Sequence, residues 1–188
     1  MVSHLLKCVF VEVPKTGSSS IRTVLREHGG KGTGKPHQDL VEISKKIDPA
    51  TMKQYYKFGF VRNPWDRVVS LYERKEGMKM SSKMSFKEFV SWIQLSSSTS
   101  IHPSPKKNQL NWFTDRQGRN IADFIGRFED LEKDWGKIGD RLGLSVPLPH
   151  KNQNPKEHYT KYYDSRTQKI IAKKFKVDID YFGYRFGQ

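Results

Sequence analysis

The feature that most constrains the fold is the stretch of residues 8–26, CVFVEVPKTGSSSIRTVLR. Residues 8–11 form a short apolar run rich in β-branched and aromatic side chains, which is typical of a buried strand. Pro14 then stops further pairing because it has no backbone N–H group. Small residues follow, and a helical pattern with one apolar face starts at Ile21. The predicted order is therefore a strand, a loop and a helix.

The loop of small residues in this stretch has the composition of an anion site. A strand-to-helix loop aims backbone N–H groups and the positive end of the helix dipole at one point. Gly17 allows close approach of the backbone, and Lys15 adds a full positive charge. Hydroxyl donors come from Ser18, Ser19 and Ser20. We therefore expect a phosphate or sulfate group at this loop, with an ordinary turn capped by serine as the alternative.

The same loop departs from the usual nucleoside-triphosphate loop. That loop needs the pattern G-x-x-x-x-G-K-[ST]. Here Lys15 precedes Gly17 by two positions, and Gly-Lys-Ser/Thr occurs nowhere in the chain. The sequence thus argues against a standard ATPase or kinase, although a nucleotide kinase or ATPase-like enzyme on a related loop stays open as an alternative.

A second stretch, residues 57–73, KFGFVRNPWDRVVSLYE, repeats this layout. It predicts a buried strand, then Asn63 as a helix N-cap and Pro64 as the first helical residue. Arg62 follows the strand, and Ser70 lies inside the helix. A guanidinium can bind a phosphate bidentately and a hydroxyl can donate to it, so this junction is a second candidate anion site.

Together the two junctions resemble the sulfotransferase superfamily, and most closely its carbohydrate sulfotransferase-like subgroup (sulfotransferase family 2). The segment PKTGSSS at residues 14–20 looks like the loop that binds the 5′-phosphosulfate group. The segment RNPWDRVVSLY at residues 62–72 looks like the 3′-phosphate motif. Residues 126–131, 148–152 and 178–184 agree with the same family in the same order. The resemblance covers nearly the whole chain.

The resemblance implies both a fold and an activity. The fold would be an α/β, P-loop-like core of three layers, with a short parallel sheet flanked by helices, which the alternation of predicted strands and helices also favours. The activity would be transfer of a sulfuryl group from 3′-phosphoadenosine 5′-phosphosulfate (PAPS) to an acceptor hydroxyl, most plainly on a carbohydrate, with adenosine 3′,5′-bisphosphate as the product. A base would take the proton of the acceptor during in-line displacement.

Roles for individual residues follow from the same resemblance. Lys15 would stabilise the charge that develops on the leaving phosphate. Arg62 and Ser70 would bind the 3′-phosphate. The 5′-phosphosulfate would be held by Lys15, Thr16, Gly17, Ser18, Ser19 and Ser20. Lys156 could add a charge near the 3′-phosphate, and Trp65 or Phe128 could support the adenine unless they belong to the core.

The general base is predicted to be His37. Histidine is the side chain that most readily accepts a proton near neutral pH. His37 follows a glycine-rich segment and precedes the second phosphate motif, which is about where family members carry their catalytic histidine. Glu42, Asp39 and His102 are the alternatives.

Composition bounds the partners. The 188 residues suit one domain spanning 1–188, and the formal net charge of +14 implies an anionic partner such as a nucleic acid, an acidic surface, or a sulfated or carboxylated polymer. The lysines are scattered, so we do not expect a nucleic-acid-binding module, which stays the second alternative. We see no His/Cys spacing of a metal site, no membrane span and no signal peptide in residues 1–7, and interpret the chain as soluble and cytoplasmic.

The remaining predictions concern single elements. Cys8, the one cysteine, is expected to be an inert core thiol. A hairpin is expected in which Trp112-Phe113 and residues 121–125 flank residues 115–120, and residues 124–128 are expected to form the next core strand. The aromatic tail at residues 181–186 is expected to dock on the core. Residues 29–36 and 96–107 are expected to be loops. Further helices are expected to begin at Asp39, Asp48, Ser85, Leu131 and Ser165. Ser85 and Glu88 are expected to form a capping box, and Ser165 is expected to cap the last helix.

Overall fold

The computed structural model describes residues 1–34, 37–73, 84–95, 108–149 and 157–188. The chain divides into two compact units, which are described one at a time. The first comprises Met1–Val61 and Gln109–Gln153, and the second comprises Arg62–Asn108 and Asn154–Gln188. A single domain over residues 1–188 stays a prediction.

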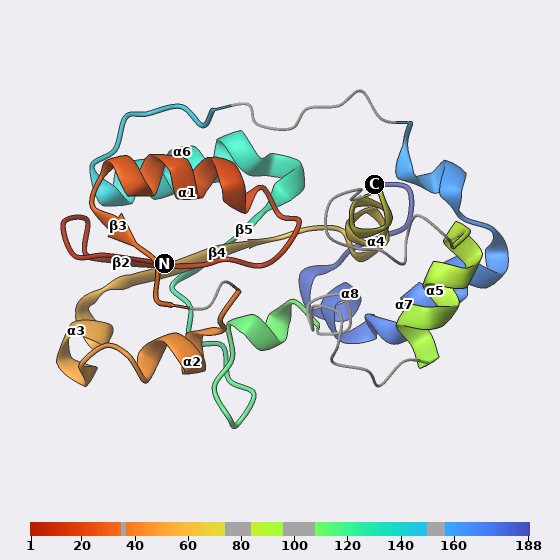
Figure 1. The fold of residues 1–188 in the computed structure, drawn as a ribbon, viewed down its shortest axis with the longest axis horizontal. Helices are drawn as coiled ribbons and strands as arrows, with labels where there is room; N and C mark the ends of the chain where they lie inside the picture. Colours follow the sequence, from red (N-terminus) through yellow and green to blue (C-terminus); the bar gives the residue numbers. More distant parts are fainter. Residues whose placement is uncertain (35–36, 74–83, 96–107, 150–156) are drawn as a thin grey trace. The chain divides into compact units, whose positions relative to one another are not determined.

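The first unit is built on a five-stranded sheet in the order β3-β1-β2-β4-β5 (Figure 1). The strands β2, β4 and β5 are parallel, and β1 runs antiparallel to its neighbours β2 and β3. Their bounds are β1 (Val2–Ser3), β2 (Cys8–Val11), β3 (Gly30–Lys31), β4 (Tyr56–Val61) and β5 (Phe124–Arg127). The predicted α/β class with a short parallel sheet is confirmed, whereas β1 was not predicted and β3 lies in a segment predicted to be a loop.

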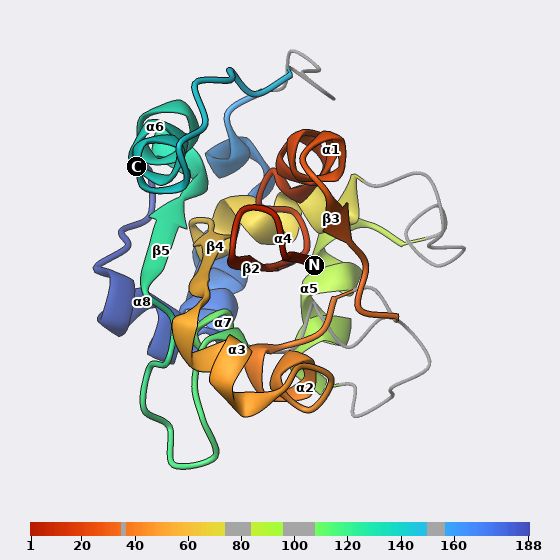
Figure 2. The same cartoon turned by 90° about the vertical axis from the view of Figure 1, so that its left-hand side faces the viewer.

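Helices cover both faces of this sheet. Figures 1 and 2 show α1 (Ser18–Glu27) and α6 (Leu131–Leu142) on one face and α2 (Leu40–Ser44) and α3 (Pro49–Gln54) on the other. The short 3-10 helices η1 (Leu110–Trp112) and η2 (Phe128–Asp130) complete the unit. Asp39 and Asp48 accept hydrogen bonds from Glu42 N and Thr51 N, which confirms both predicted helix starts.

The core of the first unit follows the alternation of the strands. Phe10 pairs in register with Phe58, and both rings lie in one buried cluster with apolar residues of α1 and α6. On the other face, a Cβ added to Gly59 would lie 2.5 Å from the ring of Phe113, so a side chain there would displace this ring. Cys8 is 1% exposed, and burial raises the pKa of its thiol to about 11, as an inert core position requires.

The predicted hairpin is only partly correct. A single bridge joins Thr114 to Asn120, η1 takes the place of the first predicted strand, and β5 starts at Phe124. The turn itself forms because the Asp115 carboxylate accepts hydrogen bonds from the backbone N–H groups of Gln117 and Arg119. Those bonds satisfy the turn locally, so no longer ladder is needed to hold it.

The second unit is helical. It contains α4 (Pro64–Tyr72), α5 (Phe86–Leu95), η3 (Tyr159–Tyr162), α7 (Ser165–Lys174) and α8 (Lys176–Phe182). Helix α5 packs against α7 (Figure 1). Helix α4 contacts α5, α7 and η3. The tail docks as predicted, since the ring of Phe186 lies edge-on to Trp65, Tyr159 and Tyr163.

Helix starts in this unit are set by capping side chains. Ser85 and Glu88 form the predicted capping box, with the Ser85 N–H donating to Glu88 Oε2 at 2.6 Å. The cap of α7 is Asp164, not Ser165 as predicted, because the aspartate is extended and its carboxylate accepts from Thr167 N at 2.8 Å. These hydrogen bonds hold the pKa of Asp164 well below its usual range, with Lys87 adding to the effect.

In the described part of the chain, no helix combines the length and the apolar character that crossing a bilayer would require.

Candidate functional site

The loop after β2 has the backbone of an anion cradle. Lys15 has φ +69° and Gly17 has φ +78°, so the left-handed conformation recurs at every second residue. The Thr16 hydroxyl donates to the Val13 carbonyl at 2.9 Å, so it shapes the loop and leaves its backbone for a ligand. A Cβ on Gly17 would lie 3.0 Å from the Leu131 side chain. Conformation and packing therefore both favour glycine at this position.

The N-terminus of α1 has no side-chain cap. Gly17 is its N-cap residue and carries no side chain to accept a hydrogen bond, and the first turn contains no acidic residue. By contrast, α2, α3 and α7 are capped by Asp39, Asp48 and Asp164. A helix start with unsatisfied N–H groups and no carboxylate attracts an external anion.

The serines of this loop lie within the first turn of the helix. Helix α1 begins at Ser18, three residues before the start that the apolar pattern predicted. Ser18 and Ser20 are buried and Ser19 is exposed. Within the described residues, none of the three hydroxyls makes a hydrogen bond. The loop therefore offers hydroxyl donors together with its backbone.

The junction after β4 is built differently. Asn63 caps α4 by accepting from Trp65 N at 3.1 Å, and its amide donates to the Arg185 carbonyl at 2.9 Å. Pro64 occupies the first helical position, as predicted. Arg62 Nε donates to Asp66 Oδ2 at 2.7 Å, which fixes the plane of the guanidinium. Asp66 lies one helical turn before Ser70 on α4.

A cavity of about 230 Å³ opens beside this arginine. Ser70 lines it, and within the described residues its hydroxyl makes no hydrogen bond. The complete lining is Arg62, Asp66, Val69, Ser70, Glu73, Glu157, His158, Tyr159 and Gln188. The second unit thus brings Arg62 and Ser70, the two residues predicted for the 3′-phosphate, to one cavity.

Arg67 belongs to the core of the second unit. Its side chain is 1% exposed, and burial lowers the pKa of its guanidinium to about 10, an effect that the charge of Asp178 opposes. Asp66 and Glu73 are close to Arg67 in the sequence and would be its local acidic partners. Asp66 instead accepts from Arg62, and Glu73 accepts from the Tyr162 hydroxyl.

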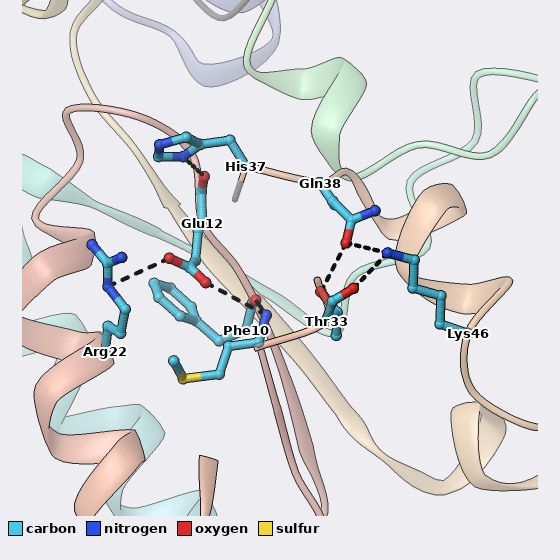
Figure 3. A network of polar contacts seen from close by, with 8 residues as sticks. Phe10, Glu12, Arg22, Thr33, His37, Gln38 and Lys46 are labelled. Atoms are coloured by element: carbon cyan, nitrogen blue, oxygen red, sulfur yellow. Dashed lines mark hydrogen bonds and ion pairs between the residues drawn. The ribbon is translucent and has the colours of Figure 1, made fainter. Parts of the chain in front are cut away.

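His37 lies at the carboxyl end of β2. Its Nδ1 is 2.9 Å from the carbonyl oxygen of Glu12, the residue that follows β2 (Figure 3). Its φ is +57°, so His37, Lys15 and Lys7 are the three non-glycine residues with positive φ in the described part of the chain. Such conformations cost energy and recur at functional sites. The loop lysine and the predicted base therefore both occupy strained backbone in the same unit.

Of the alternative bases, two cap a helix and one lies outside the described residues. Asp39 accepts from Glu42 N at 2.8 Å, and Glu42 accepts from Asp39 N at 3.0 Å, so both carboxylates cap α2. His102 and Lys156 lie outside the described residues. Glu12 was not predicted as a site residue, although a charged residue between the buried Val11 and Val13 is a signal in the sequence.

The two candidate adenine platforms have packing roles. Trp65 is 4% exposed, and its indole N–H donates to the Gln168 carbonyl at 3.1 Å. Phe128 lies against the position that a Cβ on Gly17 would occupy, with its Cδ2 3.4 Å away. These contacts favour the alternative in which both rings are structural.

Comparisons with known proteins agree with the family that the two motifs predicted. The sequence profile of the sulfotransferase family matches residues 1–185. An uncharacterized protein of Archaeoglobus fulgidus is 32% identical over 108 residues, a match that covers 56% of this chain and 82% of the relative. No solved structure matches the chain significantly. Because the family profile spans nearly the whole chain, this protein belongs to the sulfotransferase family and is an enzyme of sulfuryl transfer.

Proposed function

We propose that this protein transfers a sulfuryl group from PAPS to an acceptor hydroxyl. The observation that carries the proposal is the start of α1, where a left-handed loop and three serine hydroxyls surround a helix N-terminus without a side-chain cap. A phosphosulfate group suits this loop because each oxygen can accept from a backbone N–H or a hydroxyl. The binding residues would be Lys15, Thr16, Gly17, Ser18, Ser19 and Ser20.

The cavity of the second unit supports the choice of nucleotide. PAPS carries a 3′-phosphate, which ATP lacks, in addition to its activated sulfuryl group. Arg62 is oriented by Asp66, and Ser70 lines the same cavity. Three carboxylates, those of Asp66, Glu73 and Glu157, also line it, so an anion there depends on the guanidinium to offset their repulsion.

The chemistry would fall to two residues of the first unit. Lys15 would stabilise charge on the leaving phosphate, which is the contribution that fixed cationic donors make in acyl and phosphoryl transfer. His37 would take the proton of the acceptor hydroxyl. The Glu12 carbonyl can only accept, so Nδ1 carries the hydrogen and the lone pair of the neutral ring is at Nε2. Nε2 is therefore the atom that would receive the proton.

The acceptor is proposed to be a carbohydrate with anionic groups. The formal net charge of +14 supports it, because such a surface attracts polyanions over a screening length of about 8–10 Å. The Michaelis constant for such an acceptor should rise steeply between low and physiological salt. A constant that salt leaves unchanged would count against an anionic acceptor and leave the transfer reaction itself untouched.

A nucleotide comparison tests the proposal against the kinase alternative. Adenosine 3′,5′-bisphosphate at about a hundred times its dissociation constant should stabilise the protein by about 2.7 kcal/mol. For a chain of this size the melting temperature should rise by about 5–10 °C. ATP at the same concentration should do much less, and an equal or larger shift with ATP would contradict the proposal. Labelled PAPS offered with immobilised glycans and small alcohols then identifies the acceptor.

A further inference from the structure

The predicted base is joined to a pair of charges at the end of β2. Glu12 presents its backbone carbonyl to His37 Nδ1 at 2.9 Å and its carboxylate to Arg22 Nε at 3.6 Å (Figure 3). The Met1 amino nitrogen lies 3.7 Å from the other carboxylate oxygen. The Glu12 side chain is 10% exposed and that of Arg22 is 30% exposed. One residue thus connects the imidazole to helix α1.

The carboxylate of Glu12 needs a cation because it is nearly buried. Removing the partner of a buried charge is costly, and the remaining group rotates or draws in water to recover its solvation. Burial lowers the pKa of the Met1 amino group, so Arg22 is the more constant of the two cations. The carboxylate and the carbonyl belong to the same residue, so a backbone shift that carries Glu12 toward water would also move the carbonyl that is the acceptor for His37.

A second group of hydrogen bonds links Thr33 to Gln38, the residue that follows His37. Lys46 Nζ donates to the Thr33 carbonyl and, at 2.9 Å, to Gln38 Oε1 (Figure 3). Lys46 is exposed, so water competes for these bonds and their loss is tolerated. The contact between His37 Nδ1 and the Glu12 carbonyl is partly buried and therefore less open to such competition.

We propose that Arg22 and Glu12 are positioning residues for His37. Arg22 lies on α1, close after the loop proposed to bind phosphosulfate, so it ties the orientation of the base to the element that would hold the donor. The inference rests on the proposed function, in which His37 is the base. Its specific content is that Arg22 acts on turnover through His37 and leaves nucleotide binding alone.

The first test is a double-mutant cycle. Arg22→Met keeps the apolar stem and removes the charge, and Arg26→Met is the matched control because Arg26 is exposed on the same helix. Arg22→Met should lower kcat by about 10- to 100-fold, the scale expected for a small misplacement of a catalytic group. Arg22→Lys should recover part of the loss, and Arg26→Met should match the wild type. The affinity for adenosine 3′,5′-bisphosphate should stay the same in all of them.

The decisive comparison adds His37→Ala. In that background Arg22→Met should cost nothing further, because the group it positions is gone. An equal loss in both backgrounds, or a loss of bisphosphate affinity in place of kcat, would overturn the inference and assign Arg22 a structural or donor-binding role. Substantial turnover in His37→Ala alone would overturn it as well.

A second measurement needs no transfer reaction. Nitrogen-15 spectra of the His37 ring should show the hydrogen on Nδ1 in the wild type and in Arg26→Met, and a mixture of both tautomers in Arg22→Met. An unchanged tautomer in Arg22→Met would defeat the inference while the proposed function stands. A changed tautomer in a protein that transfers no sulfuryl group would support the positioning link and defeat the proposed function.

Discussion

After β2 the chain turns into α1 with Lys15 and Gly17 in left-handed conformation and no side chain over the helix N-terminus. After β4 it turns into α4, which is capped by the side chain of Asn63 and has Pro64 in its first helical position. Both stretches predict a strand, a short connection and a helix. The first connection has no side chain that accepts from its N–H groups, although Ser20 N donates to the Gly17 carbonyl, whereas the second is capped by the side chain of Asn63.

The difference assigns a different means of anion binding to each junction. At the first, the backbone and small hydroxyls are the donors, so the shape of the loop decides the affinity. At the second, the helix start is occupied and the donors are the side chains of Arg62 and Ser70, held by Asp66 and by the turn of the helix. Changes of loop conformation should therefore weaken anion binding at the first site, and loss of a side-chain charge should weaken it at the second.

The largest effect is expected from removing the predicted base, His37. His37→Ala should lower turnover by about 10²- to 10⁴-fold while bisphosphate affinity is kept, because a general base acts on the acceptor proton alone. Glu42→Ala and His102→Ala are the controls. Should His37→Ala keep more than about a tenth of the turnover, the base is another residue.

The second largest effect is expected from removing the positive charge of Lys15 at the first junction. Lys15→Ala should lower kcat by about a hundredfold or more, as removal of a donor to developing charge does. Its effect on binding of adenosine 3′,5′-bisphosphate should be smaller, since the backbone and serines of the loop remain. Initial rates at saturating PAPS measure kcat, and calorimetry measures the affinity for adenosine 3′,5′-bisphosphate. A variant with normal kcat and weak binding would make Lys15 a ground-state ligand only.

At the second junction the change should appear in binding. Arg62→Ala should weaken the binding of adenosine 3′,5′-bisphosphate by about 2–3 kcal/mol. The substitution removes charge-assisted bonds to the 3′-phosphate and leaves no cation beside the carboxylates of the cavity to offset their repulsion. Adenosine 5′-phosphate, which lacks the 3′-phosphate, should bind both proteins alike. Arg166→Ala, an exposed arginine of α7, is the control. Normal bisphosphate binding by Arg62→Ala would remove the 3′-phosphate from this cavity.

The parts of the fold that the sequence predicted correctly are those with local signals. The strands β2, β4 and β5 are apolar runs that end at Pro14, at Asn63-Pro64 or at the start of a helix, so each signal lies within a few residues. The strands β1 and β3 are two residues long and exist through pairing with each other and with β2. No periodic pattern fits into two residues, which is why both were missed.

The candidate site divides in the same way. The residues of the two phosphate motifs could be named from adjacent positions in the sequence. Asp66, the partner of Arg62, is also local, whereas two other partners are not, because Asp178 is far along the chain from Arg67 and the acceptor of His37 is a backbone carbonyl. A carbonyl leaves no mark on the identity of its residue, so the orientation of the base could be found only from the structure.

The smallest expected effect compares two glycines of the first unit. Gly17→Ala should lower the free energy of unfolding by about 1–2 kcal/mol, because alanine resists the left-handed conformation. Its Cβ would also lie 3.0 Å from Leu131. Gly136→Ala should raise that free energy by about 0.5–1 kcal/mol, since it lies inside α6 with nothing within 4 Å of its Cβ. Urea unfolding of both variants gives the signs, and bisphosphate affinity should fall for Gly17→Ala alone. If Gly17→Ala bound the bisphosphate normally, the backbone of the first junction would not be the donor surface that distinguishes it from the second.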